Sequence, residues 1–316
     1  MIRSCATCFL VLAMSAPAAY ADILGAAAPY GVVAGSTVTN PTTNAATIIF
    51  GSMAVSPGSA CTGFLPGTPD ICTFGPGMVT GFTDLAGGAG DAAAASAEAA
   101  VDNAELALLA SGPATDLTGG TLGVAGDATL APGVYSFSTS VTAGLIGTLT
   151  LAGGGDLHPL WIFQIGRDLT TAAFSSVVVT GAGAAAAGVY WVTGTQTTLG
   201  NSSTFQGNVF AGSSVVFDPG AQITCGRAFA DTAVTFGGND PASTVGVPNL
   251  VNSGPCTAGT TSGSPSGNNN GVFITLPGGG TGVGPGPAAV PEPSSYALLS
   301  SVLGALVLSR KFRRVR

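Results

Sequence analysis

The chain has 316 residues, a formal net charge of −7 and only 7% charged residues, against about 25% in an ordinary soluble domain. Its 49 glycines and 20 prolines predict frequent turns, and a hydrophobic content of 46% is enough for a folded core. Away from the two ends the only basic residues are Arg167 and Arg227, so the acidic central part excludes a nucleic-acid-binding role.

Residues 1–21 have the pattern of a secretory signal peptide. Arg3 precedes an apolar stretch, and Ala19-Tyr20-Ala21 supplies the small-x-small cleavage pattern before Asp22. The alternative, a membrane anchor, is disfavoured because the apolar stretch is short for a bilayer span. We therefore expect export, with a folded domain over residues 22–255.

The first part of that domain alternates strand-like pieces with one helix. Residues 24–58 predict short strands and tight turns, and residues 61–82, rich in Pro and Gly, predict a loop or cap. An Ala-rich segment without Pro predicts a helix over about 89–110. One side of it is apolar, and we expect the other, with Asp91, Glu98, Asp102 and Glu105, to be a solvated face.

Three later segments share one phase of alternation: 196–199, 214–217 and 233–236. Each ends on a large apolar residue, which predicts Leu199, Phe217 and Phe236 inside and Thr198, Val216 and Thr235 outside. The outward residues are 18 and 19 positions apart, a near-constant step that is typical of a β-solenoid. Thr170 fits an earlier strand of the series, with an excursion over 175–188 before the next one. Gln196, Ser214 and Ala233 would form the neighbouring outward column.

Four cysteines remain after the leader, an even number that suits an oxidising compartment. Cys61 with Cys72 and Cys225 with Cys256 is the pairing we favour, although four cysteines allow three arrangements. Residues 256–289, rich in Gly, Ser and Pro, predict a flexible linker.

The sequence offers few groups for catalysis or metal binding. His158, the single histidine, stands in a predicted turn, and no Cys or His spacing fits a zinc site. Trp161 and Trp191 lie in apolar strands and are expected in the core. Asp168, Asp218 and Asp231 are expected at turns. We predict no enzyme, no catalytic residue, no metal and no cofactor, with a polysaccharide lyase or hydrolase as a lesser alternative.

Residues 290–316 combine Pro291-Glu292-Pro293, an apolar stretch of about 16 residues and a basic tail. This order resembles the PEP-CTERM sorting signal of Gram-negative bacteria. The resemblance implies transient inner-membrane anchoring through 294–309, cleavage by an exosortase-type peptidase, and release to the cell surface or outside. A simple membrane anchor is the alternative.

A longer resemblance covers roughly residues 23–239. The segments LAPGVYSF, LWIFQIGRDLTTA, GAGAAAAGVYWVTG and GAQITCGRAFADTAVTF follow one another as in the microbial ice-binding proteins. The resemblance implies a mainly β fold, a right-handed discontinuous β-solenoid of triangular cross-section with one long α-helix packed alongside. It also implies that a flat outward face, here Thr170, Thr198, Val216, Thr235, Gln196, Ser214 and Ala233, adsorbs to ice or ordered water.

From this resemblance we expect a secreted, monomeric ice-binding protein with antifreeze or recrystallisation-inhibiting activity. Two residues interrupt the predicted face: Gln196 is large, and Asp168 places a charge at its edge. The alternative is a structural or adhesive protein of an extracellular polysaccharide matrix, without activity on ice.

Overall fold

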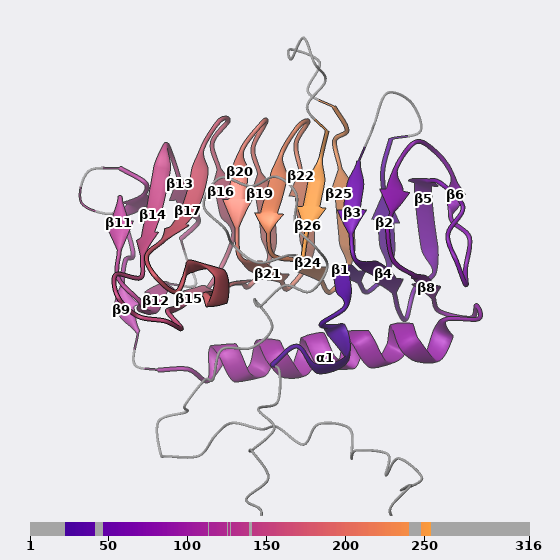
Figure 1. The fold of residues 1–316 in the computed structure, drawn as a ribbon, viewed down its shortest axis with the longest axis horizontal. Coiled ribbons are helices and arrows are strands. Elements are labelled where there is room, and N and C mark those ends of the chain that lie inside the picture. Colours follow the sequence, from indigo (N-terminus) through magenta and orange to yellow (C-terminus); the bar gives the residue numbers. More distant parts are fainter. Residues whose placement is uncertain are drawn as a thin grey trace, which may run out of the picture.

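The computed structural model of the protein describes residues 23–41, 47–112, 114–124, 126, 128–138, 141–239 and 248–253. The expected leader, the linker, Cys256 and the motif Pro291-Glu292-Pro293 lie outside these residues. Within them, strands of three parallel sheets stack along one axis, and a single long helix lies beside the stack (Figure 1). The predicted solenoid is confirmed, with three strands in a complete coil.

Sheet A is the face that the helix covers. Its central strands, such as β1, β4 and β18, are buried on both sides because the core lies beneath them and the helix above, whereas the edge strand β9 is exposed. In spatial order they are β8 (Thr83–Leu85), β4 (Ser52–Val55), β1 (Tyr30–Ala34), β24 (Ala228–Ala230), β21 (Asn208–Ala211), β18 (Gly188–Thr193), β15 (Leu160–Ile165), β12 (Gly133–Phe137) and β9 (Thr115–Asp116).

Sheet B follows sheet A along each coil and has one side free of the helix. In spatial order it contains β10 (Thr121–Leu122), β13 (Ala143–Leu145), β16 (Leu169–Thr171), β19 (Gln196–Leu199), β22 (Ser214–Phe217), β25 (Ala233–Phe236), β2 (Thr37–Thr39), β5 (Ala60–Phe64) and β6 (Thr73–Phe74). Sheet C closes the triangle with β11 (Thr129–Leu130), β14 (Thr148–Ala152), β17 (Ser176–Thr180), β20 (Thr204–Gln206), β23 (Gln222–Cys225), β26 (Leu250–Asn252), β3 (Ile48–Phe50) and β7 (Met78–Val79).

The order of strands in space differs from their order in sequence at one junction. The N-terminal strand β1 lies between β4 and β24, so the first coil stacks on the last one. Helix α1 (Asp91–Leu109) makes this possible because it carries the chain along sheet A from the β8 end to the β9 end (Figure 1). Its 19 residues span about 28 Å, most of the ~38 Å that nine stacked strands occupy.

A short helical turn and a buried arginine lie at this junction. The 3-10 turn η1 (Gly25–Ala27) precedes β1, and the side chain of Arg227 donates to the carbonyl of Ala28 at 2.7 Å and to Asn208 at 3.2 Å. Arg227 is fully buried, and it ties the N-terminal segment to the last coils. A second turn, η2 (Ala184–Ala186), occupies the excursion expected between the coils of Thr170 and Thr198.

Helix α1 packs through small side chains and is held at both ends by the solenoid. Its buried stripe is the predicted one: Ala94, Ala97, Val101, Ala104 and Leu108. At the N-terminus, the carboxylate of Asp70 accepts hydrogen bonds from the backbone N–H groups of Ala89 (2.7 Å) and Gly90 (3.0 Å). At the C-terminus, the Gln164 side-chain amide donates to the carbonyls of Leu108 (2.8 Å) and Ser111 (2.6 Å). Groups that a helix leaves without intrahelical partners are thereby satisfied.

The core contains stacked aromatic rings from successive coils. Phe163 and Trp191 stack with ring centroids 3.8 Å apart, and Phe205 lies 4.9 Å from Trp191. Both tryptophans are fully buried, as expected. A second row joins Phe217 to Phe236 at 4.7 Å.

The segment expected to be a loop or cap is partly ordered into strands. Residues 61–82 contain most of β5 together with β6 and β7, which form the last, irregular coil at the β8 end of the stack. A disulfide joins Cys61 to Cys72 across this coil, as favoured from the sequence. Cys225 is also disulfide-bonded, and its expected partner Cys256 lies outside the described residues.

Candidate functional surface

The outward side of sheet B is an array of small side chains. In β19, β22 and β25, residues alternate strictly between buried and half-buried positions. Leu199, Phe217 and Phe236 point into the core, as predicted, while Thr198, Val216 and Thr235 point outward. The alternation predicted from the sequence is therefore present in these three strands.

The register of the strands aligns the outward residues into columns. Thr198 pairs with Thr170 on one side and with Val216 on the other, and Val216 pairs with Thr235. The same register continues in both directions through every strand of sheet B. We call this set the threonine column: Thr121, Gly144, Thr170, Thr198, Val216, Thr235, Thr39, Thr62 and Thr73.

A second column runs beside it, two residues earlier in each strand. It consists of Gln196, Ser214, Ala233, Thr37 and Ala60, aligned by the same ladders. The two columns are joined within β2, where the hydroxyls of Thr37 and Thr39 lie 3.4 Å apart. Together the two columns form a face two residues wide, which we call the sheet B face.

Sequence reasoning missed the N-terminal part of this face. Thr37, Thr39, Thr62 and Thr73 extend the columns beyond Thr235, yet they precede it in the chain by more than 150 residues. The signal available was local: the segment Ser36-Thr37-Val38-Thr39 has the same alternation as the later strands. Its place next to β25 follows only from the junction of first and last coils.

A charged pair flanks the sheet B face at the β16 coil. Asp168 accepts hydrogen bonds from the Thr195 hydroxyl and from the backbone N–H of Gln196, the latter at 3.2 Å. Arg167 lies 3.3 Å from its carboxylate. The Thr195 hydrogen bond is the main reason that the pKa of Asp168 is lowered, so the charge at this edge persists into mildly acidic solution. The face is free of such charges in β22, β25, β2 and β5.

The acidic side of helix α1 is solvated only in part: Asp91 and Asp102 are exposed, as expected from the sequence, but the two glutamates are not. Glu98 and Glu105 are half-buried at the rim where the helix meets the solenoid, and one carboxylate oxygen of Glu98 is buried without a hydrogen-bond partner. Burial, with the charges of Asp102 and Asp231, raises the pKa of Glu98 to about 8. Burial, with the same two charges, raises that of Glu105 to about 7. The helical period correctly predicted the apolar stripe of α1. It could not predict that the β24–β25 turn, which carries Asp231, lies close to Glu98 and Glu105 at the edge of that stripe.

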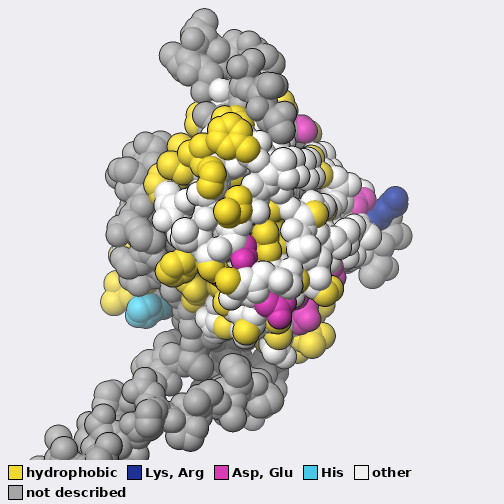
Figure 2. All heavy atoms as spheres, turned by 90° about the vertical axis from the view of Figure 1, so that its right-hand side faces the viewer, with side chains coloured by type: hydrophobic (Ala, Val, Ile, Leu, Met, Phe, Trp, Pro, Cys, Tyr) yellow, Lys and Arg dark blue, Asp and Glu magenta, His cyan; other side chains and the backbone are white. Residues whose placement is uncertain are grey.

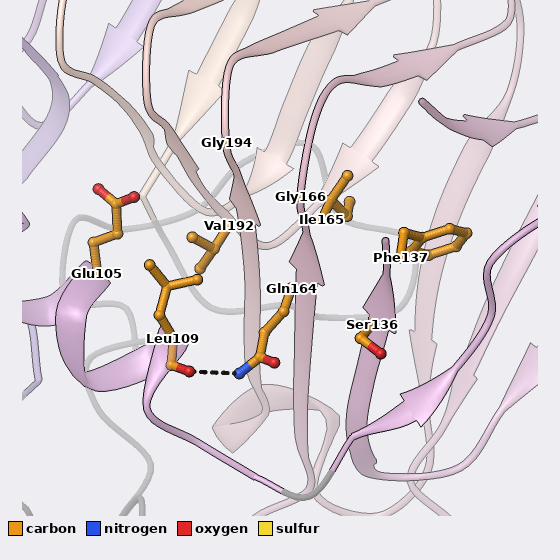
Figure 3. Close-up of a pocket in the computed structure, with 9 residues that line it drawn as sticks. All are labelled: Glu105, Leu109, Ser136, Phe137, Gln164, Ile165, Gly166, Val192 and Gly194. Atoms are coloured by element: carbon orange, nitrogen blue, oxygen red, sulfur yellow. Dashed lines mark hydrogen bonds between the residues drawn. The ribbon is translucent and has the colours of Figure 1, made fainter. Parts of the chain in front are cut away.

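A shallow hollow of about 250 Å³ lies between the C-terminal part of α1 and sheet A (Figure 3). Its lining is mostly apolar, including Leu109, Phe137, Ile165 and Val192, and the Gln164 amide beside them donates to Leu109. Glu105 is its one charged lining residue, without the second carboxylate that glycoside hydrolysis requires. Among the residues that the structure describes, no cluster of three or more His, Cys, Asp or Glu could hold a metal ion.

The fold and the sheet B face define a class: a discontinuous β-solenoid with a flanking helix and one regular face of small outward residues. Residues 32–240 match the ice-binding-like family model. An ice-binding protein of Nostoc sp. (strain HG1) is 42% identical over 229 residues, which are 71% of this chain and 75% of that relative. The chain therefore belongs to the ice-binding-like family.

Solved structures of the same class agree with this assignment. The crystal structure of an ice-binding protein from the Antarctic ascomycete Antarctomyces psychrotrophicus has a TM-score of 0.55 and 33% identity, covering 72% of this chain and 96% of that one. The DUF3494 domain of Shewanella frigidimarina ice-binding protein 1 has a TM-score of 0.57 and 28% identity, covering 73% and 96%.

Proposed function

We propose that the protein adsorbs to ice through the sheet B face and thereby limits ice growth or recrystallisation. The observation that carries this proposal is the threonine column, which keeps its register across the junction of the first and last coils. Family membership and the names of the relatives, ice-binding proteins, support the same ligand.

The physical basis is a rigid grid of groups that hold water in two ways. A threonine hydroxyl donates and accepts hydrogen bonds, and its methyl group orders adjacent water without bonding to it. Strands stack about 4.8 Å apart, and outward residues repeat about every 6.7 Å along a strand. Threonine is branched at Cβ and has few side-chain rotamers, so little conformational entropy is lost when the face meets a surface.

We place the contact area on the half of the face formed by β19, β22, β25, β2 and β5. Side chains here are small, except for Gln196, and the charged pair of Arg167 and Asp168 lies at the β19 border of this area, where Asp168 accepts the Gln196 N–H. Thr170 adjoins that border. The proposed contact residues are Thr198, Val216, Thr235, Thr39, Thr62, Ser214, Ala233, Thr37 and Ala60.

The proposal describes a binding protein without catalysis that acts outside the cell. The leader over 1–21 supports export, and the motif at Pro291-Glu292-Pro293 supports processing by an exosortase-type peptidase of a Gram-negative bacterium. Within the described residues, no helix is long and apolar enough to cross a membrane. Family relatives named for ice binding and the lack of a carboxylate pair in the hollow support a non-enzymatic role.

The experiment is thermal hysteresis and recrystallisation inhibition with face variants. Thr39→Tyr and Thr198→Tyr each raise a large ring above the face and should reduce activity at least about tenfold, because the grid can no longer lie flat. The matched control is Thr150→Tyr, at a half-buried outward position of β14 in sheet C, which should keep full activity. Equal loss in all three variants, or an inactive parent, would refute the assignment. An inactive parent that is retained on exopolysaccharide would favour the matrix alternative.

A further inference from the structure

The end of the solenoid formed by β6, β7 and β8 exposes an unusual number of large apolar side chains. We call the set the apolar end face: Leu65 (43% exposed), Ile71 (70%), Phe74 (69%), Met78 (38%) and Phe82 (63%). Backbone hydrogen bonds from Leu65 to Gly77 and from Gly75 to Phe64 hold these segments together across the last coil. Figure 2, which views this end of the stack, shows hydrophobic side chains gathered on its left and lower parts, with polar surface on the right and acidic side chains below the centre. Solenoid ends are ordinarily covered by polar groups.

The coils at this end expose little charge, although the chain as a whole has a formal net charge of −7. An exposed carboxylate beside them is that of Asp91 at the start of α1, which accepts a hydrogen bond from the Gly87 N–H at 2.8 Å. Between residues 57 and 90 the charged residues are Asp70 and Asp84 alone. Asp84 is 5% exposed and accepts a hydrogen bond from the Tyr30 hydroxyl at 2.6 Å, while Asp70, 9% exposed, accepts three backbone N–H groups. An acidic protein can meet a copy of itself through the side chains of these coils with Asp91, on the adjoining helix, left in water.

The opposite end of the stack is mostly polar where the structure describes it, although Val124, between β10 and β11, is 38% exposed. Thr115, Asp116, Thr118 and Thr129 are exposed on or next to the edge strands β9 and β11. A head-to-tail chain of copies would place this polar end on the apolar one. A two-fold arrangement instead places apolar on apolar, which is the self-complementary geometry of most homodimers.

The size of the apolar end face suits a weak dimer. A phenylalanine side chain offers roughly 200 Å² of surface, so Phe74 and Phe82 together leave on the order of 250 Å² in water. With the three aliphatic residues the apolar end face reaches about 500–600 Å², the largest that monomeric proteins ordinarily show. Two copies would bury about 1,000–1,200 Å², the lower limit of specific interfaces.

We propose that a second copy of this chain docks on the apolar end face, forming a reversible two-fold dimer in which the two apolar end faces meet. Pro66, Pro69 and Pro76 interrupt the segments next to the edge strands and lack the N–H groups needed for continued sheet pairing. The contact is therefore made by side-chain packing around Phe74 and Phe82. This departs from the monomer expected from the sequence and is independent of the ligand of the sheet B face.

The test is sedimentation of the protein purified from an exporting bacterial host, over about 1–100 µM, since association follows mass action. We expect a monomer–dimer equilibrium that Phe74→Ser combined with Phe82→Ser weakens at least about tenfold. The matched control is Phe174→Ser, because Phe174 is 74% exposed on the β16–β17 turn, away from the cap, and its replacement should leave the dimer intact. Circular dichroism and melting confirm that each variant is folded.

A second variant keeps the test decisive if the double replacement does not fold. Ile71→Lys introduces a charge at a 70% exposed side chain and should dissociate the dimer with little effect on melting. A parent that is monomeric at about 100 µM, or a dimer that survives both cap variants, overturns the proposal. A dimer lost on Leu299→Asp in the apolar tail, but kept in the cap variants, also overturns it.

Discussion

We predict that two carboxyl groups at the rim of helix α1 make the stability of the protein fall as the pH rises through neutrality. Glu98 and Glu105 face Asp102 on the same helix and Asp231 on the β24–β25 turn. In the unfolded chain both glutamates titrate near 4.5, whereas in the folded protein the pKa values are about 8 and about 7. The folded state therefore holds more protons between these limits, and its stability is greatest when both groups are protonated.

The size of the stability change follows from the number of pH units between pH 6 and the folded-state pKa of each glutamate. The free energy of unfolding falls from pH 6 to about pH 8 because of Glu98 and from pH 6 to about pH 7 because of Glu105. These three pH units together correspond to about 4 kcal/mol. Screening by solvent at the helix rim reduces this to about 2–4 kcal/mol. For a folded domain of this size the melting temperature should fall by about 5–15 °C over that interval.

Differential scanning calorimetry at fixed ionic strength between pH 6 and pH 9 measures the effect. The variant Glu98→Gln with Glu105→Gln should lose most of the pH dependence and be more stable than the parent at pH 9. Asp91→Asn, on an exposed residue of the same helix, should keep the slope of the parent. A parent whose melting temperature stays constant or rises from pH 6 to pH 9 would show that the two carboxyls are solvated.

Two further changes test the aromatic core and the disulfide of the last coil at the β8 end. Trp191→Ala removes a fully buried ring that stacks 3.8 Å from Phe163 and should cost about 3–5 kcal/mol in urea unfolding, with Phe174→Ala, on an exposed ring, close to neutral. Replacing Cys61 and Cys72 together by serine opens a loop closed over a sequence separation of 11 and should cost about 3 kcal/mol. The parent under reducing conditions should lose at least as much, because Cys225 is disulfide-bonded as well. Unchanged unfolding of the double variant would contradict the role given to the Cys61–Cys72 disulfide.

The sequence predicted those parts of the fold that depend on local alternation. Thr198, Val216 and Thr235 could be aligned because consecutive coils repeat at a near-constant step and each strand ends on a large core residue. The Ala-rich composition predicted the helix itself, and the family resemblance supplied its place beside the solenoid and the discontinuous stack. Thr39 and Thr62 were missed as members of the face because they align with Thr235 across the junction of the first and last coils. The constant step between consecutive coils does not extend across that junction, so it could not predict their position.

Polar contacts between residues far apart in the chain could not be predicted from local sequence patterns either. The capping of α1 by Asp70 and Gln164 links residues up to 56 positions apart, and nothing in their own segments distinguishes these side chains from ordinary loop and strand residues. The prediction of solvated acids on α1 is confirmed for Asp91 and Asp102 but was wrong for Glu98 and Glu105, for the same reason. A helical period shows which side is apolar but not which turn of the solenoid lies against its border.

The junction of β1 with β24 also constrains the order in which the protein can fold. Until residues 228–230 arrive, β1 has no partner on that side, and its backbone N–H and C=O groups remain an open edge. The first coils therefore cannot be completed when only the N-terminal part of the chain has been synthesised. The final step must join segments nearly 200 residues apart. Such closure is slow because the entropy of a long loop is lost before the contacts form. The chain thus remains incompletely folded until almost the whole domain has been synthesised.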